Sequence, residues 1–212
     1  RYPDPLQTEL KDMVAKVKRV PAENIFLGNG SDEAIDLPYR CFTRPGVDNV
    51  VAIEPTYGMY KVCADINDVE YRPVPLDDDF RLDAGKVLAA CDANTKMIVL
   101  TNPNNPIGVT LYDEGLRKVV DIAAKHDAWI LCDEVYRGLD ENYMPSILDY
   151  GYHKAISISS MSKMYSMAGT RIGWIVCRDH EMYEVMKTRR SYNTICCGIW
   201  DETVSYTHLT LP

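Results

Sequence analysis

Apolar positions recur along the chain with two different patterns, one helical and one continuous. Between residues 6 and 17 they fall three or four positions apart, which predicts a helix with one buried face. A short apolar run at 24–27 predicts a strand, and the Gly-rich turn at 28–30 opens a second helix. Pro38 lies inside this second helix and should kink or shorten it.

The alternation of strand and helix continues to residue 190. Apolar runs predict strands at 49–53, 69–73, 97–100, 128–132, 156–158 and 172–177. Helical patterns lie between or after them at 59–65, 83–91, 113–125 and 179–190. We expect the last of these to be the final helix, with Arg189 and Arg190 at its solvated end. The order predicts an α/β fold of three layers, α/β/α, with a mostly parallel sheet.

Composition narrows the class of protein. With 212 residues, 46% of them hydrophobic, the chain can bury a sizeable core. The net charge of −8 argues against nucleic acid as a partner, and no apolar run approaches the roughly 20 residues that a bilayer requires. Seven cysteines without a C-x-x-C pair indicate reduced thiols rather than a disulfide framework or a metal site. The N-terminus does not resemble a signal peptide, so we expect a cytoplasmic protein.

Polar side chains follow several of the predicted strands. Tyr57, Asn105, Asp133, Tyr136 and Lys163 each lie at the carboxyl end of an apolar run or just beyond it. Because the carboxyl ends of parallel strands meet at one edge of a sheet, we expect these side chains to lie together. The acidic strand end of a P-loop nucleotidase is excluded because the chain has no G-x-x-x-x-G-K-[ST] motif.

The chemistry of these residues fits one cofactor, pyridoxal 5'-phosphate. The amine of Lys163 can condense with its aldehyde, and a buried Asp133 carboxylate can keep the pyridine nitrogen protonated. Asn105 and Tyr136 can donate hydrogen bonds to the phenolic oxygen, while Tyr57 can stack on the ring. We therefore predict Lys163, Asp133, Tyr136 and Asn105 as catalytic residues and Tyr57 as a cofactor contact.

The cofactor phosphate requires hydroxyl groups, backbone N–H groups and a guanidinium. Ser160 and Ser162 lie just before Lys163, Arg171 lies eight residues after it, and the turn at Ser31-Asp32 opens a helix with free N–H groups. Each signal alone has a plainer explanation, such as an ordinary N-cap at Ser31 or a surface lysine in a Ser-rich loop. Their convergence at one sheet edge favours the cofactor site.

Three motifs carry a resemblance to a known family. They are Asn102-Pro103-Asn104-Asn105-Pro106-x-Gly108, Asp133-Glu134-x-Tyr136, and Ser160-x-Ser162-Lys163 with Arg171. Together they resemble the class I and II aminotransferases, pyridoxal-phosphate enzymes of fold type I. Over residues 1–108 the chain resembles the histidinol-phosphate aminotransferase branch in Arg1-Tyr2-Pro3-Asp4-Pro5, Gly30-Ser31-Asp32-Glu33 and Pro55-Thr56-Tyr57-Gly58-Met59-Tyr60.

The resemblance implies a transaminase that converts histidinol phosphate and 2-oxoglutarate to imidazole-acetol phosphate and glutamate. Lys163 would both anchor the cofactor and move the substrate proton, and Tyr2 would reach the cofactor phosphate of a partner subunit in a homodimer. The resemblance also implies a fragment, with residues 1–203 forming an incomplete large domain. The N-terminal arm and the C-terminal small domain, with its substrate-binding arginines, would lie outside it. We expect residues 204–212, which match nothing in the family, to be a non-native tail.

Several alternatives stay open from the residues alone. After the motif Asn102–Gly108 the chain resembles other branches of the family more closely, so it could join two related sequences there. Another class I or II amino-acid aminotransferase, or a lyase or decarboxylase of the same fold, would keep the same cofactor residues. A non-catalytic sensor domain would be expected to carry a basic DNA-binding segment, and the sequence contains none. The fragment alone could also be inactive.

Overall fold

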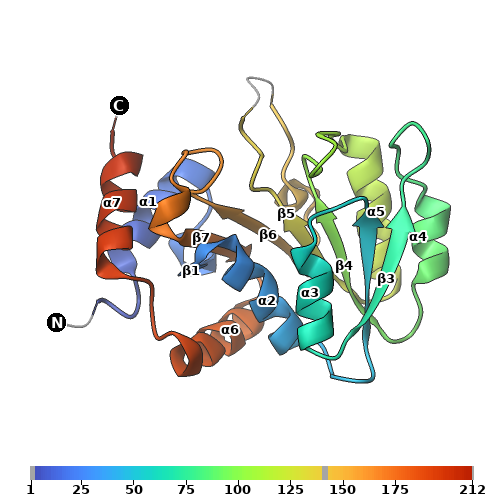
Figure 1. The fold of residues 1–212 in the computed structure, drawn as a ribbon, viewed down its shortest axis with the longest axis horizontal. Helices are drawn as coiled ribbons and strands as arrows, with labels where there is room; N and C mark the ends of the chain where they lie inside the picture. The colour runs from blue at the N-terminus through green and yellow to red at the C-terminus, as the bar shows by residue number, and fades with distance from the viewer. Residues whose placement is uncertain (1–2, 140–142, 212) are drawn as a thin grey trace.

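A single mixed sheet forms the centre of the molecule. The computed structural model describes residues 3–139 and 143–211, and within them seven strands pair in the order β1-β7-β6-β5-β4-β2-β3 (Figure 1). The strands are β1 (Ile25–Asn29), β2 (Asn49–Glu54), β3 (Glu70–Pro75), β4 (Thr95–Thr101), β5 (Trp129–Asp133), β6 (Ala155–Ser160) and β7 (Ile172–Cys177). Only β7 runs antiparallel to its neighbours, which are β1 and β6. The mostly parallel sheet is confirmed.

Helices cover both faces of this sheet. They are α1 (Thr8–Lys18), α2 (Gly30–Phe42), α3 (Met59–Ile66), α4 (Ala84–Ala90), α5 (Asp113–Lys125), α6 (His180–Asn193) and α7 (Ile199–Leu209). Short 3-10 turns lie at η1 (Ala22–Asn24), η2 (Ile147–Tyr150) and η3 (Ala168–Thr170). Helices α2, α3 and α6 pack on one face, whereas α1, α4 and α5 pack on the other (Figure 1). The three-layer α/β/α prediction is therefore confirmed.

The core divides between the two faces because successive strand residues point to opposite sides. In β2, Val50 packs with α2 and α3 on one face, and the next residue, Val51, packs with α4 and α5 on the other. Both side chains are fully buried. Strands of this kind are apolar on both sides, which explains their continuous apolar pattern in the sequence.

One expectation about the helices is wrong, and so is part of another. Helix α6 is followed by α7, which packs against α1, and Ser205 is its one buried residue within the described part of the chain. A helix with so little burial has no apolar stripe that a pattern could reveal. Helix α2 is also not shortened by Pro38, because it continues to Phe42 with Leu37, Pro38 and Tyr39 buried. Helix α7 crosses residue 203, so the domain boundary predicted there remains a prediction.

The expectation of a solvated Arg190 is also wrong. This side chain is 3% exposed and donates hydrogen bonds to the carbonyl oxygens of Leu27, at 2.6 Å, and Pro5, at 3.0 Å. It also donates to the side-chain oxygen of Gln7. Arg190 therefore ties α6 to β1 and to the segment that precedes α1.

The direction of the strands places their carboxyl ends at one edge of the sheet. Strands β1, β2, β4, β5 and β6 all end there. Because β7 runs the other way, it begins at this edge, with Gly173 opposite Ser160 of β6. The residue before β7, Arg171, therefore lies beside the carboxyl ends of the parallel strands.

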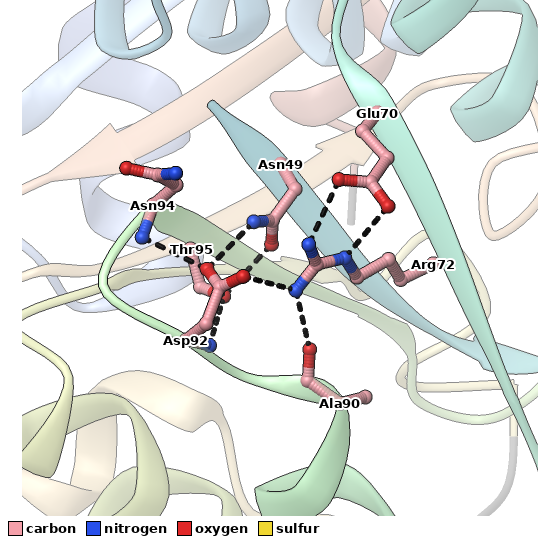
Figure 2. A network of polar contacts seen from close by, with 7 residues as sticks. All are labelled: Asn49, Glu70, Arg72, Ala90, Asp92, Asn94 and Thr95. Carbon is pink, nitrogen blue, oxygen red and sulfur yellow. Dashed lines mark hydrogen bonds and ion pairs between the residues drawn. The ribbon is translucent and has the colours of Figure 1, made fainter. Parts of the chain in front are cut away.

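A polar network occupies the opposite edge (Figure 2). The carboxylate of Asp92 accepts a hydrogen bond from the Asn49 amide at 2.9 Å and pairs with Arg72 at 2.7 Å. Arg72 also pairs with Glu70 at 2.8 Å, within the same strand. This network joins β2, β3 and the loop before β4 at their starting ends.

Within residues 3–139 and 143–211, no helix is long and apolar enough to span a bilayer. Nor do three or more His, Cys, Asp or Glu side chains gather there as a metal ion would require.

Candidate active site

A cavity of about 170 Å³ lies at the carboxyl edge of the sheet. Its lining residues come from the carboxyl ends of β4 and β5, from loops that follow four strands, from the start of α2 and from the loop before β7. They are Ser31, Asp32, Tyr57, Thr101, Asn105, Asp133, Val135, Tyr136, Ser162, Lys163, Ala168 and Arg171. Every site residue predicted from the sequence lines this cavity except Ser160 and Tyr2.

Ser160 and Tyr2 differ from the other predicted site residues. Ser160 is fully buried at the end of β6, where its Oγ accepts a hydrogen bond from the Ser162 backbone N–H at 3.3 Å. It therefore stabilises the turn before Lys163, and the structure does not place it on the cavity wall. Tyr2 lies outside the described residues.

A larger cavity of about 510 Å³ lies elsewhere, between the end of α1 and residues of the segments 137–138 and 143–149. Its lining includes Lys18, Glu134 and Trp174 but none of the predicted site residues. Size alone would therefore not select the smaller cavity, whereas the convergent polar groups at the sheet edge favour it.

Asp133 is the most buried ionisable group of the smaller cavity. Its side chain ends β5 and is 2% exposed. One carboxylate oxygen accepts a hydrogen bond from the Tyr60 hydroxyl at 3.0 Å, and the other accepts from the Val135 backbone N–H at 3.0 Å. Burial raises the pKa of Asp133 to about 6, and the hydrogen bonds from these two neutral donors offset only part of that rise.

Lys163 and Tyr136 face each other across the cavity. Lys163 follows β6 on an exposed loop, and its ammonium lies 5.8 Å from the centroid of the Tyr136 ring. Tyr136 lies three residues beyond Asp133, in the turn that follows β5. The amine and the buried carboxylate are thus carried by two adjacent parallel strands.

Asn105 reaches the cavity on a loop that its neighbours hold in place. The Asn102 side chain exchanges hydrogen bonds with the backbone of Leu111, at 2.8 and 3.0 Å. The Asn104 amide donates to the Pro55 carbonyl oxygen at 3.0 Å. These amides anchor the Asn-Pro loop to β2 and to the start of α5, while Asn105 lines the cavity.

The start of α2 forms an anion cradle with Arg171. Gly30 has φ +82°, and a Cβ at this position would come within 2.3 Å of the Arg171 guanidinium. The backbone also approaches closely, because a Cβ at Gly173 would lie 2.6 Å from the Ser31 nitrogen. The N–H groups of a first helical turn have no partner inside the helix, so they can bind a phosphate together with the guanidinium.

Asp32 adds a negative charge to this cradle. Its carboxylate accepts a hydrogen bond from the Tyr57 hydroxyl at 3.0 Å and lies 3.9 Å from Arg171. Burial and the Asp32 carboxylate raise the pKa of Tyr57 to about 12. The Tyr57 ring meets the Tyr60 ring edge to face, with centroids 5.9 Å apart. Asp32 therefore holds the ring predicted to stack on the cofactor.

Sequence reasoning missed Tyr60 and Thr101. The Tyr60 hydroxyl lies 2.6 Å from the Thr101 hydroxyl and 3.0 Å from Asp133. Their signals were weak, since Tyr60 falls inside an apolar helical pattern and Thr101 is the last residue of a buried strand.

Comparisons with known proteins agree with this geometry. The chain matches the family model for aminotransferase class I and II over residues 1–203. It is 46% identical over 194 residues to a histidinol-phosphate aminotransferase of Bacteroides fragilis, and 44% identical over 195 residues to one of Bacteroides thetaiotaomicron. Each match covers 91% of this chain and 55% of the relative, so the chain spans about half the length of these proteins. Each also crosses Asn102–Gly108, because neither half alone is long enough to contain it.

Solved structures give the same fold. A PLP-dependent aminotransferase from Streptococcus suis is 32% identical with a TM-score of 0.87, and the match covers 97% of this chain and 54% of that one. The aspartate aminotransferase of Thermotoga maritima is 24% identical with a TM-score of 0.93, covering 100% and 59% of the two chains. The family match over residues 1–203, together with a lysine, a buried aspartate and an anion cradle at one sheet edge, shows that the chain belongs to the class I and II aminotransferases.

Proposed function

We propose that this chain is the cofactor-binding part of a pyridoxal-phosphate-dependent histidinol-phosphate aminotransferase. The observation that supports this most is that Lys163, Asp133 and the Arg171 cradle line one cavity of about 170 Å³. The substrate assignment has a different basis, namely the names of relatives that are 44–46% identical. The reaction proposed for the whole protein is histidinol phosphate and 2-oxoglutarate to imidazole-acetol phosphate and glutamate.

The side chains and backbone groups of the cavity match the chemical groups of pyridoxal phosphate. Asp133 is a buried carboxylate whose hydrogen-bond donors are neutral, so a protonated ring nitrogen would supply the positive charge that balances it. The N–H groups at Ser31 and Asp32, the Ser162 hydroxyl and Arg171 would hold the phosphate. Bound pyridoxal phosphate supplies an aldehyde that condenses with a lysine amine and a ring that withdraws electrons from the substrate carbon.

Each residue then has a separate task in transamination. Asp133 would hold the ring nitrogen and keep it protonated, while Asn105 and Tyr136 would donate hydrogen bonds to the phenolic oxygen. The Tyr57 ring, fixed by Asp32, would cover one face of the cofactor. The Lys163 amine would accept the proton from the substrate Cα and later give it up, acting as general base and then as general acid.

The proposal also includes a homodimer and further groups that bind the substrate. Tyr2 would reach the cofactor phosphate of a partner subunit. Groups that bind the substrate carboxylate or phosphate would come from the part of the relatives that this chain does not span, since it covers 55% of their length.

The lysine assignment can be tested by covalent trapping. The chain would be incubated with pyridoxal phosphate, reduced with borohydride and digested for peptide mass spectrometry. We expect the cofactor on the peptide that contains Lys163, and the absorbance of the bound cofactor should disappear in Lys163→Ala. Lys118→Ala is the matched control, since Lys118 is half-exposed on α5 and pairs with Glu114 at 2.7 Å, away from the cavity. Labelling that is unchanged in Lys163→Ala would refute the assignment.

Transamination and lyase activity can be distinguished with a full-length protein that contains this chain. An aminotransferase should release 2-oxoglutarate from L-glutamate in a single turnover, in an amount equal to that of the bound cofactor. A lyase or decarboxylase would release none. Activity with histidinol phosphate but not with aspartate would then support the substrate assignment.

A further inference from the structure

Tyr60 contacts the site from the helical layer without lining the cavity. It lies in α3, is fully buried, and reaches the carboxyl ends of β4 and β5. Its hydroxyl contacts the Asp133 carboxylate at 3.0 Å and the Thr101 hydroxyl at 2.6 Å. The Thr101 hydroxyl in turn lies 3.2 Å from that of Thr56. Three hydroxyl groups thus form a continuous chain that ends on one carboxylate oxygen.

The direction of these hydrogen bonds follows from the ionised carboxylate. An ionised carboxylate only accepts, so Tyr60 must donate to Asp133. The Tyr60 oxygen then accepts from Thr101, and Thr101 accepts from Thr56. Every hydroxyl proton in the chain points toward Asp133, and such an arrangement stabilises the charged form of the acid.

We propose that Tyr60 is a positioning residue for Asp133, which fixes the orientation of its carboxylate and favours its ionised form for contact with the cofactor ring nitrogen. This inference rests on the proposed function. The edge-to-face contact between Tyr60 and Tyr57, at 5.9 Å, extends the same role to the ring predicted to cover the cofactor. One buried side chain therefore supports both the nitrogen partner and the stacking partner.

The charges around Asp133 make this hydrogen bond important. Two other carboxylates, Glu134 just after β5 and Asp32 at the start of α2, raise its pKa further, whereas the hydrogen bonds from Val135 and Tyr60 lower it. The remaining ionisable groups around the site are Tyr57, Cys132, Tyr136, Lys163 and Arg171. Among the side chains, Tyr60 is the donor that contacts the carboxylate directly.

The test compares Tyr60→Phe with the unchanged chain. This substitution keeps the buried ring and removes only the hydroxyl. Tyr71→Phe is the matched control, because the Tyr71 hydroxyl also donates to a carboxylate, that of Glu54 at 2.6 Å, outside the cavity. Ionisation of Asp133 would be followed by carbon-13 NMR of labelled aspartate carboxyl groups. Asp133→Asn identifies the resonance by its loss.

In the chain without cofactor, Tyr60→Phe should raise the pKa of Asp133 by about one to two units, because a hydrogen bond to a charged group is removed. Tyr71→Phe should leave it unchanged. In the second measurement, an absorbance titration with pyridoxal phosphate, Tyr60→Phe should bind about ten-fold more weakly. An unchanged Asp133 pKa would overturn the effect on ionisation, and an unchanged cofactor affinity would overturn the positioning role.

The two measurements separate failure of the inference from failure of the proposed function. If the unchanged chain bound no pyridoxal phosphate, the proposed function and the cofactor part of this inference would both fall. The effect of Tyr60 on Asp133 ionisation would still be decided by the NMR titration. If the unchanged chain and Tyr60→Phe bound the cofactor equally, only the positioning role would be refuted.

Discussion

Asp133 combines burial with a negative charge, and this makes it costly to the folded chain when the site holds no cation. A side chain that is 2% exposed loses nearly all of its hydration, and neutral donors replace only part of it. Such a cost is typical of functional sites, where a ligand supplies the missing charge. Asp133 thus destabilises the chain without cofactor, and the same residue is best placed to hold a protonated ring nitrogen.

A first prediction follows for Asp133→Asn. Folding raises the pKa of Asp133 from 3.8 to about 6, so the protonated form is favoured in the folded state. The stability that the protonated carboxyl group contributes is fully present below pH 3.8 and is lost as the pH rises through about 6. Above that pH the ionised carboxylate costs about 3 kcal/mol.

Urea unfolding of the chain without cofactor at pH 4.5 and pH 8 would measure this effect. The unfolding free energy of Asp133→Asn, relative to the unchanged chain, should increase between the two pH values by about 2 kcal/mol, because part of the effect is already present at pH 4.5. Asp12→Asn, at an exposed position on α1, serves as the control. A difference that does not change with pH would contradict the predicted ionisation.

Close packing between β7 and α2 creates the anion cradle at the level of secondary-structure elements. Gly28 of β1 lies opposite Gly173 of β7, and a Cβ at Gly173 would lie 2.4 Å from the Gly30 carbonyl carbon. Because backbone atoms are involved, no side-chain rotation can relieve such a contact. The absence of a side chain at Gly173 allows the first turn of α2 to approach Arg171.

Gly173→Ala should therefore destabilise the chain by about 3 kcal/mol, as overpacking against backbone does. It should also weaken phosphate binding, because α2 must move away from Arg171. Gly58→Ala is the matched control, since no heavy atom lies within 4 Å of its added Cβ and its φ is −61°. Urea unfolding measures the first effect, and a pyridoxal phosphate titration measures the second. Equal stability of the two variants would show that β7 and α2 can separate at no cost.

At the scale of the whole molecule, the two edges of the sheet carry polar groups with different roles. At the carboxyl edge they line a cavity, and at the opposite edge they satisfy one another (Figure 2). Asp92 illustrates the second case, because hydrogen bonds from Asn49 and Arg72 lower its pKa to about 2. One edge is therefore prepared for a ligand, whereas the other joins strands that are distant in the sequence.

Asp92→Asn should accordingly lower the stability of the chain near neutral pH, and the loss should be smaller in acid. The folded pKa lies below the ordinary 3.8, so the stability contributed by Asp92 is present above that value and is lost as the pH falls toward 2. The side chain is 44% exposed, so solvent screening reduces the expected loss at pH 7 to about 1 kcal/mol. Thermal unfolding between pH 7 and pH 3 measures it, with Asp79→Asn on an exposed loop as the control. A loss that grows in acid would contradict this role.

The sequence alone determined most of the elements, the fold class and most of the cavity lining. Hydrophobic period is a local property, so the strands at 172–177 and the helix at 113–125 could be placed to the residue. Side chains after parallel strands share one edge whatever the order of those strands, which is why Asp133 and Lys163 could be grouped without a structure.

Only the tertiary structure decided which residues touch. The antiparallel direction of β7 places Arg171 beside Gly30, and strand order brings Tyr60 and Thr101 to Asp133. Burial of Arg190 and the existence of α7 likewise depend on packing between distant segments. Such contacts follow from the order and direction of strands, which a local pattern of apolar residues does not encode.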